Sequence, residues 1–186
     1  MDHNSPNGVV PPRQLISAAQ IAARVATLGR EIADAVPDGT IHVVGVLRGA
    51  FVFMADLVRA LPRDTRCDFL AVRSYGSATE TSGVVEITSD LGLPIAGRHV
   101  LLVEDIVDTG LTLRYLLDIL KTRQPASVRV CALLDKPSRR RVEVPLDFFG
   151  FEIQNQFVVG YGLDHDQRYR NLPYVGAIEE QAEGNR

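Results

Sequence analysis

Three carboxylates and two hydroxyls lie within nine residues of the sequence, in the stretch 104-EDIVDTGLT-112. The stretch follows the apolar run 100-VLLV-103, which is typical of a buried strand, and it leads into leucines at helical spacing. The first turn of a helix suits a phosphate dianion, because its backbone N–H groups are unpaired and the helix dipole is positive there. Gly110 lets the backbone approach a ligand closely, and Thr109 and Thr112 add hydroxyl donors. The sequence therefore predicts a phosphate site at this point.

Glu104 and Asp105 need a partner other than phosphate, because two carboxylates repel an anion. The vicinal hydroxyls of a ribose, or a Mg²⁺ ion bound to them, would suit both side chains. The Walker pattern is absent and no lysine follows Gly110, which disfavours a nucleoside triphosphatase and favours a terminal monophosphate. The alternative for each residue alone is structural: Asp108 would cap the helix, and Glu104 and Asp105 would form a solvated turn. The ordered set instead indicates a site for ribose 5-phosphate.

Length and composition are those of a single soluble globular domain. The 186 residues are enough to bury a core, and 46% of them are hydrophobic and 23% charged. The net charge of −3 gives no field that would attract nucleic acid or an acidic membrane. Cys67 and Cys131 are far apart, which is typical of a reduced cytosolic protein and disfavours a zinc site. Neither a signal peptide nor a membrane-spanning run is recognisable, so we expect a cytoplasmic protein without a membrane partner.

Predicted strands and helices alternate along the chain. Ser17 and Gln20 fit a capping box ahead of an amphipathic helix, and Pro37 ends that pattern. Further helices are predicted over residues 51–61 and 111–120, and strands over residues 41–46, 68–75, 84–88, 100–103, 128–134, 146–153 and 157–162. Residues 76–83 are small and polar, as in a mobile loop, and residues 1–12 are expected to form a loose tail.

The central predicted strands are apolar along their whole length, which indicates an α/β domain with a parallel sheet between helices. Ligands of such sheets bind beyond the carboxyl ends of the strands. The loops that start at Leu47, Glu104, Asp135 and Asp164 are therefore expected to share one crevice.

The stretch 100-VLLVEDIVDTGLTL-113 resembles the phosphoribosyl-pyrophosphate signature of type I phosphoribosyltransferases. Other segments resemble, in order, those of the bacterial hypoxanthine (hypoxanthine-guanine) phosphoribosyltransferases: LRGAFVFMADL, DFLAVRSYGS, TSGVVEITSDL, LLDKPSRR and FVVGYGLDHDQRYRNLPYVG. The match runs from about residue 15 to residue 178, nearly the whole chain. The signature alone indicates the superfamily, whereas LLDKP and FVVGYGLD indicate its 6-oxopurine branch.

The resemblance implies a fold and an activity. The fold would be the type I phosphoribosyltransferase fold, a twisted and mainly parallel sheet flanked by helices, with a small hood built from the chain ends. Residues 1–186 would form one such domain. The activity would be Mg²⁺-dependent transfer of ribose 5-phosphate from phosphoribosyl pyrophosphate to N9 of hypoxanthine or guanine, giving IMP or GMP and pyrophosphate. Relatives are homo-oligomers, so a dimer or tetramer is expected.

The resemblance also implies a role for each matching residue. Asp108 would be the general base near N7 of the purine. The ribose and 5-phosphate would be bound by Glu104, Asp105, Asp108, Thr109, Gly110, Leu111 and Thr112. Pyrophosphate would be bound by Leu47, Arg48, Gly49 and Arg170. Mg²⁺ would be bound by Glu104, Asp105 and Asp164. Ser74, Tyr75 and Gly76 would begin a flexible lid that excludes water.

The purine site would comprise Lys136, Phe157, Val158 and Asp164. Lys136 would donate to the 6-oxygen of the purine, Phe157 would stack on the ring, and the backbone of Val158 would contact it. Taken singly, Lys136 could be a solvated residue at a strand end, and Phe157 could belong to the core. Asp164 and Arg170 could equally belong to a polar surface segment.

The sequence departs from the family pattern in the loop 47-LRG-49, where Arg48 stands at a position that is often lysine. Since this loop would act mainly through backbone amides, activity is expected to survive the change. Leu111 replaces a polar residue of some relatives and would face the phosphate through its backbone alone.

Two other functions remain open from the sequence. A transferase that prefers xanthine or guanine would keep the same chemistry, because the groups around C2 of the purine are not identifiable here. A nucleic-acid-binding regulator would use the phosphoribosyl site as a sensor, with the basic run 139-RRR-141 contacting phosphates. Asp108 and the negative net charge favour an enzyme over that regulator.

Overall fold

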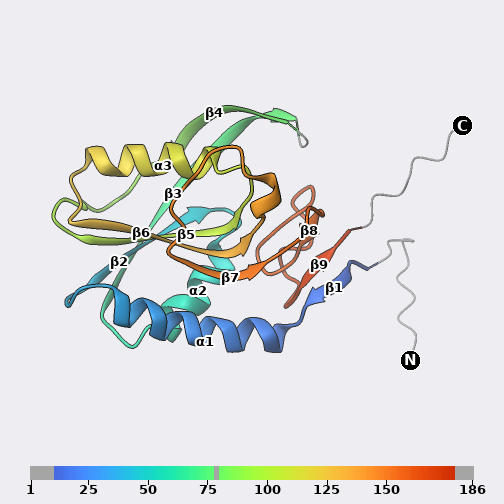
Figure 1. The fold of residues 1–186 in the computed structure, drawn as a ribbon, viewed down its shortest axis with the longest axis horizontal. Coiled ribbons are helices and arrows are strands. Elements are labelled where there is room, and N and C mark those ends of the chain that lie inside the picture. Colours follow the sequence, from blue (N-terminus) through green and yellow to red (C-terminus); the bar gives the residue numbers. More distant parts are fainter. Residues whose placement is uncertain (1–10, 78–79, 179–186) are drawn as a thin grey trace, which may run out of the picture.

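The computed structural model describes residues 11–77 and 80–178, which form a six-stranded sheet, three α-helices and a small three-stranded sheet (Figure 1). The strand order of the larger sheet is β4-β3-β2-β5-β6-β7. The bounds are Ile41–Leu47 for β2, Thr65–Ser77 for β3, Glu80–Ser89 for β4, His99–Val107 for β5, Ser127–Asp135 for β6 and Phe148–Glu152 for β7. All neighbours pair in parallel except β3 and β4. The expected α/β class with a mainly parallel sheet is confirmed.

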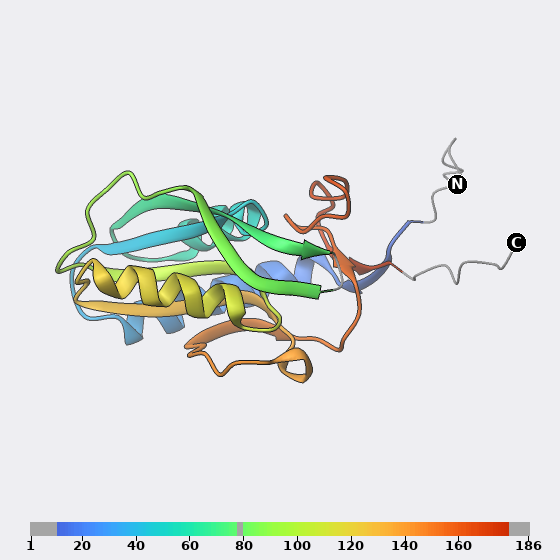
Figure 2. The ribbon, with the colours of Figure 1, turned by 90° about the horizontal axis from the view of Figure 1, so that it is seen from above.

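Helices cover both faces of this sheet. Helices α1 (Ala18–Ala35) and α2 (Phe51–Ala60) lie on one face, and α3 (Leu111–Thr122) lies on the other (Figures 1 and 2). Val43 faces the layer of α1 and α2, while its neighbour Val44 faces α3, and both are fully buried. Because both faces are covered, the strands are apolar along their length, as the sequence indicated.

The first helix begins and ends where its sequence predicts. The Ser17 hydroxyl accepts the backbone N–H of Gln20 at 3.2 Å, and the Gln20 side chain accepts the backbone N–H of Ser17 at 2.9 Å. The helix ends at Ala35, just ahead of Pro37. The Arg63 guanidinium then donates to the free carbonyls of this end, those of Ala33, Val36, Pro37 and Gly39. The donor to Ala33 replaces a missing intrahelical partner of the last turn, and the other donors bind the chain that leaves the helix.

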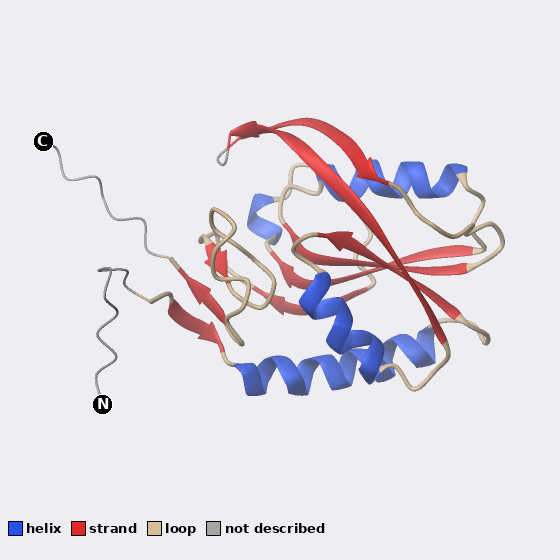
Figure 3. Cartoon of the chain, turned by 180° about the vertical axis from the view of Figure 1, so that it is seen from behind, coloured by secondary structure: helices blue, strands red, loops and turns tan. Residues whose placement is uncertain are grey.

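The smaller sheet joins the two ends of the described chain and forms the expected hood. It has the order β1-β9-β8, with β1 at Arg13–Ile16, β8 at Val158–Val159 and β9 at Val175–Ala177 (Figure 3). The sequence predicted neither β1 nor β9. Of the strand predicted at 157–162, only Val158–Val159 forms a strand, so the rest of that prediction is wrong. The chain leaves β8 at once because Gly160, Tyr161 and Gly162 all have positive φ. That conformation is incompatible with a strand.

The mobile loop predicted at 76–83 is wrong for the described residues. Strand β3 continues to Ser77 and β4 begins at Glu80, with Tyr75 opposite Val84 and Gly76 opposite Thr81. Antiparallel backbone hydrogen bonds override the composition of this segment, since strand preference depends mostly on context. Residues 78–79 of the predicted loop, and residues 1–10 of the predicted tail, lie outside the described residues.

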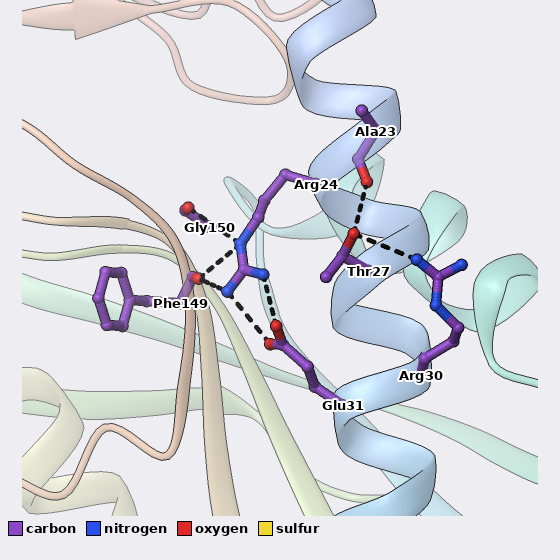
Figure 4. Close-up of polar contacts among 7 residues, drawn as sticks. All are labelled: Ala23, Arg24, Thr27, Arg30, Glu31, Phe149 and Gly150. Carbon is purple, nitrogen blue, oxygen red and sulfur yellow. Dashed lines mark hydrogen bonds and ion pairs between the residues drawn. The ribbon is translucent and has the colours of Figure 1, made fainter.

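The edge strand β7 is covered by a side chain of α1 (Figure 4). Arg24 donates from Nη2 to the carbonyl of Phe149 at 2.7 Å and from Nε to that of Gly150 at 3.2 Å. Its Nη1 also pairs with Glu31 at 2.8 Å. Occupied carbonyls and a nearby charge make an edge strand a poor template for pairing with another chain. Arg24 therefore attaches α1 to the sheet and occupies two carbonyl acceptors of its edge strand. Among the described residues, no helix is long and apolar enough to cross a membrane.

Candidate active site

The loop between β5 and α3 lies at the carboxyl end of the sheet, as predicted. Helix α3 starts at Leu111, and Gly110 precedes it with a φ of +83° and no side-chain cap. Asp108 is therefore not the helix cap, so that structural alternative is wrong. A cavity opens here, which we call the helix-start cavity. It is lined by Glu104, Ile106, Val107, Asp108, Thr109, Gly110, Thr112, Leu113, Arg139 and Arg141.

Glu104 and Asp105 lie inside β5, which corrects the prediction of an acidic loop from residue 104 onwards. The strand continues to Val107, because Glu104 pairs with Ala132 of β6 and Val107 pairs with Asp135. Glu104 is 6% exposed, so a solvated turn is excluded. Burial, reinforced by Asp105, raises the pKa of Glu104 well above its ordinary value. Burial likewise raises the pKa of Asp105 to about 6.

Two glycines allow close packing next to Asp105: Gly49 lies against Asp105, and Gly162 lies against Gly49. The Leu47–Arg48 peptide bond is cis, and the next residue is Gly49. Gly49 lies so close to β5 that a Cβ at this position would be 1.5 Å from Oδ2 of Asp105. A Cβ on Gly162 would lie 2.2 Å from the carbonyl oxygen of Gly49. Only glycine allows both approaches. The loops after β2 and β8 therefore meet at the end of β5.

Arg48 and Arg170 converge on one amide. The Oε1 atom of Gln167 accepts from Nη1 of Arg48 at 3.1 Å and from Nη2 of Arg170 at 3.2 Å. Arg170 also pairs with Asp164 at 2.7 Å and donates to the carbonyl of Gly162 at 2.7 Å. Sequence reasoning missed Gln167. Its only signal was a polar residue inside the segment 164-DHDQRYRN-171, which does not reveal a link to Arg48.

The second cavity lies between β5, the end of β6 and the hood, and we call it the hood-side cavity. It is lined by Asp105, Ile106, Asp108, Lys136, Arg139, Asn155, Gln156, Phe157, Val158, Leu163, Asp164 and Ile178. Lys136, Phe157, Val158 and Asp164 are thus together, as predicted. Sequence reasoning missed Asn155, Gln156 and Ile178, which no motif distinguishes from ordinary polar or core residues.

The surroundings of Lys136 and Phe157 exclude their structural alternatives. Lys136 is only 7% exposed, so it is not a solvated residue at a strand end. Burial lowers the pKa of Lys136, Asp108 opposes that effect and Arg139 adds to it. Phe157 is 40% exposed, so it is not a core residue, and its ring lies nearly perpendicular to that of His165, with the ring centroids 5.2 Å apart. A buried ammonium and an exposed ring in one cavity can bind a flat polar heterocycle.

The basic run predicted as a possible contact for nucleic acid folds back onto the site instead. Arg139 pairs from Nε with Oδ1 of Asp108 at 3.2 Å. Arg140 donates from Nη1 to the carbonyl of Asp108 at 2.6 Å and also pairs with Asp135. The backbone N–H of Arg141 donates to the carbonyl of Thr109 at 3.0 Å. These contacts hold the loop before α3 in place.

The predicted metal ligands are oxygen donors of the two cavities: Glu104 lines the helix-start cavity, and Asp105 and Asp164 line the hood-side cavity. Asp164 is near enough to Asp105 to oppose the lowering of its pKa by Arg170. Within residues 11–77 and 80–178, no group of three or more His, Cys, Asp or Glu side chains is arranged to hold a metal ion by itself. Mg²⁺ commonly binds through one or two carboxylates and completes its shell with substrate oxygens and water. The residues present fit that kind of site.

The predicted lid residues Ser74, Tyr75 and Gly76 lie in the last part of β3. The hairpin of β3 and β4 extends beyond the sheet on the side where the hood lies (Figures 1 and 2). The role of these three residues as a lid stays a prediction.

Comparison with known proteins identifies the family. The sequence of residues 13–166 matches the phosphoribosyl transferase domain. The chain belongs to this family. It is 52% identical over 171 residues to a hypoxanthine-guanine phosphoribosyltransferase of Mycobacterium avium, covering 89% of this chain and 84% of that protein. It is 51% identical to the hypoxanthine phosphoribosyltransferase of Haemophilus influenzae, covering 88% of this chain and 93% of that protein.

A solved structure agrees with this phosphoribosyltransferase in fold. A hypoxanthine phosphoribosyltransferase from Staphylococcus aureus superimposes with a TM-score of 0.90 at 35% identity, covering 99% of this chain and all of that one. The match to the family domain ends at residue 166, so Arg170 and β9 lie beyond it. These relatives are named as phosphoribosyltransferases, which are enzymes. As a member of the same family, this protein is an enzyme as well.

Proposed function

We propose that this phosphoribosyltransferase is a purine-salvage enzyme. It transfers ribose 5-phosphate from phosphoribosyl pyrophosphate to N9 of hypoxanthine or guanine, giving IMP or GMP and pyrophosphate. The similarity to hypoxanthine and hypoxanthine-guanine phosphoribosyltransferases over most of the chain supports this function. The observation that carries it is the pair of cavities that meet at Asp108, one at the start of α3 and the other beside Lys136 and Phe157.

The 5-phosphate would lie in the helix-start cavity, which Thr109, Gly110 and Thr112 line, and it would be bound by their hydroxyls and N–H groups. Leu111 does not line this cavity, and its N–H group lies 3.4 Å from the Thr109 hydroxyl, from which it would turn to the phosphate. The purine would lie in the hood-side cavity. There the ammonium of Lys136 would donate to its 6-oxygen, Phe157 would stack on its ring, and Val158 would contact it through the backbone. Since Asp108 lines both cavities, its carboxylate would lie between the ribose and the imidazole part of the purine.

In the transfer, the bond between C1′ of the ribose and the pyrophosphate oxygen breaks, and the oxygen keeps the electron pair. The bond between C1′ and N9 forms, and the proton displaced from the purine passes to Asp108 as general base. Positive charge develops on the ribose in the transition state, so the carboxylates of Glu104 and Asp105 near its hydroxyls would stabilise it. A lid formed by Ser74, Tyr75 and Gly76 would exclude water, which would otherwise take the place of the purine.

Pyrophosphate would be bound by the loop Leu47–Arg48–Gly49 and by Arg170. The convergence of Arg48 and Arg170 on Gln167 supports this assignment, because two guanidinium groups already face one oxygen atom. Mg²⁺ would be held by Asp105, Glu104 and Asp164 together with substrate oxygens, and it would supply charge neutralisation to the leaving group. We also propose a cytoplasmic location. We further propose a homo-oligomer, either a dimer or a tetramer, and light scattering of the purified protein would measure its molar mass.

The test is nucleotide formation by purified protein with phosphoribosyl pyrophosphate, Mg²⁺ and, separately, hypoxanthine, guanine, xanthine, adenine and uracil. Product with hypoxanthine or guanine, lost on chelation of the metal, is expected. Product with xanthine, and none with hypoxanthine, would favour the transferase that prefers xanthine or guanine. Absence of product with every base, together with binding of phosphoribosyl pyrophosphate, would contradict the proposed transferase activity. The regulator that uses the phosphoribosyl site as a sensor would then be the better interpretation.

A further inference from the structure

Arg139 lies where the two cavities meet. Only Ile106, Asp108 and Arg139 line both the helix-start cavity and the hood-side cavity as described. Ile106 is apolar and Asp108 is the proposed base, so Arg139 is the cation at this junction. Its Nε atom lies 3.2 Å from Oδ1 of Asp108, and its side chain is 35% exposed. An ion pair that is partly shielded from water and lies between two ligand cavities is placed to influence chemistry.

The turn that carries Arg139 also carries Lys136. The backbone N–H of Arg139 donates to the carbonyl of Lys136 at 3.0 Å, and that of Arg140 donates to Pro137 at 3.1 Å. These bonds form the short 3₁₀ turn Pro137–Arg139, named η1, directly after β6. Lys136 and Arg139 are thus one turn apart on a single rigid unit. The charge of Arg139 acts on both Asp108 and Lys136. It pairs with the carboxylate of Asp108, and it adds to the lowering of the pKa of Lys136.

Neighbouring residues already fix the backbone of the loop that carries Asp108. Arg140 donates to the carbonyl of Asp108, and the N–H groups of Arg141 and Val142 donate to the carbonyl of Thr109 at 3.0 and 3.2 Å. Gly110 is packed so closely that a Cβ would lie 2.7 Å from the carbonyl oxygen of Val142. Within the described residues, Arg140, Arg141 and Val142 contact the backbone of the loop. Arg139 instead donates to the carboxylate of Asp108. Folding of the loop and orientation of the carboxylate therefore have separate causes.

We propose that Arg139 is a positioning residue for Asp108. By holding Oδ1, it leaves Oδ2 directed at the purine and keeps the carboxylate from rotating away as ligands fill the two cavities. The same guanidinium balances the negative charge of Asp108 next to an incoming phosphate dianion. This inference rests on the proposed function, because it concerns the group that accepts the purine's proton.

The experiment is a double-mutant cycle on kcat with hypoxanthine, phosphoribosyl pyrophosphate and Mg²⁺, using Arg139→Gln, Asp108→Asn and the double variant. Arg139→Gln is expected to lower kcat by about 10-fold, the equivalent of one misaligned charged hydrogen bond. In the Asp108→Asn protein the same change is expected to alter kcat by less than about 2-fold. Arg139→Lys, which restores the charge but not the planar guanidinium, is expected to recover part of the loss.

The matched control is Arg129→Gln. Arg129 pairs with Asp147 at the same distance, 3.2 Å, and is 36% exposed, but it lies near the start of β6, away from both cavities. The Arg129→Gln variant is expected to leave kcat unchanged. Thermal unfolding of each variant monitors folding, and Arg140→Gln is expected to lower the melting temperature more than Arg139→Gln does, because Arg140 holds the backbone.

An equal loss of kcat from Arg139→Gln in both backgrounds would overturn the inference, and so would no loss in the wild-type background. If Asp108→Asn alone leaves kcat unchanged, the proposed role of Asp108 fails and Arg139 has nothing to position. If Asp108→Asn lowers kcat while Arg139→Gln does not, only the role of Arg139 fails. The two proposals are therefore separable by the same set of proteins.

Discussion

Gly49 and Asp105 are in such close contact that no side chain fits between them. A Cβ on residue 49 would lie 1.5 Å from Oδ2 and 2.3 Å from Cγ of Asp105. The two residues are far apart in the sequence, one in the loop after β2 and the other in β5. The contact joins the proposed pyrophosphate loop to a proposed ligand of the ribose and Mg²⁺. Any larger residue at position 49 must move one of them.

Gly49→Ala is therefore expected to lower kcat/KM for phosphoribosyl pyrophosphate by about 100-fold, the usual consequence of a displacement of about 1 Å in a reacting site. Steady-state kinetics with saturating hypoxanthine measure the effect. Gly92→Ala is the matched control, because a Cβ there would meet only Oδ1 of Asp68 at an ordinary 3.8 Å. Equal activity of the two variants would mean that Asp105 can move without cost.

Asp108→Asn is expected to lower kcat by about 10²–10⁴-fold, because an amide does not accept the purine's proton. Folding should be unaffected, since the loop backbone is held by Arg140 and by the N–H group of Arg141. Asp118→Asn, on the exposed side of α3, removes one carboxylate elsewhere and should keep full activity. Unchanged turnover of the Asp108 variant in a single-turnover assay would remove its assignment as general base.

Lys136→Met is expected to lower kcat/KM for hypoxanthine by about 10- to 100-fold, because the purine loses a charged hydrogen-bond donor worth about 1.5–3 kcal/mol. The KM for phosphoribosyl pyrophosphate should change little. The melting temperature should stay the same or rise, since burial disfavours the ammonium, as its lowered pKa indicates. Lys121, the other lysine of the chain, lies in the last turn of α3, so Lys121→Met is the control. A large fall in stability without a change in kinetics would make Lys136 structural.

His42 should make the stability of the fold depend on pH. It is 2% exposed in β2, and neither ring nitrogen has a hydrogen-bond partner within the described part of the chain. Burial lowers the pKa of His42 from 6.5, Asp68 opposes this effect, and Arg66 and Arg98 add to it. The folded protein thus binds fewer protons than the unfolded chain once the pH falls below about 6.5. The free energy of unfolding is expected to decrease there, by at most about 1.4 kcal/mol per pH unit from this group.

Denaturation with urea between pH 8 and pH 5 measures that dependence in the wild-type protein and in His42→Leu. The variant removes the titrating ring and two buried nitrogen atoms without hydrogen-bond partners, of which Nε2 lies 4.0 Å from Oδ2 of Asp68. Its stability at pH 8 should therefore be equal or greater. The difference in free energy of unfolding between the two proteins should grow as the pH falls. Parallel curves for the two proteins would show that other groups cause the acid sensitivity.

Local sequence patterns were sufficient for many elements of this protein. The capping box at Ser17 and Gln20 fits its helix because both partners lie within one turn. The uninterrupted apolar strands indicated a sheet covered on both faces, and burial of Val43 and Val44 on opposite sides agrees. The Gly110 turn before α3 was readable for the same reason, because helix starts depend on neighbouring residues. The order of its motifs indicated the family.

Only the tertiary structure decided features that depend on residues distant in the chain. Glu104 and Asp105 belong to a strand because β6 lies beside them. Residues 80–83, ahead of the strand predicted at 84–88, are part of β4 because β3 lies beside them. The same holds for the hood strands β1 and β9, which local patterns did not predict and which pair across almost the whole chain length. Strand formation by polar residues depends on a partner that local composition does not reveal.

The site divides in the same way. The sequence by itself determined which residue types are present and which lie next to each other, such as Asp108, Thr109 and Gly110. The fold decided that Arg48 and Arg170 share Gln167, and that Arg139 holds Asp108. These contacts join residues from different loops, and the loops meet because parallel strands bring their carboxyl ends to one edge of the sheet. Spacing along the chain contains no distance of this kind.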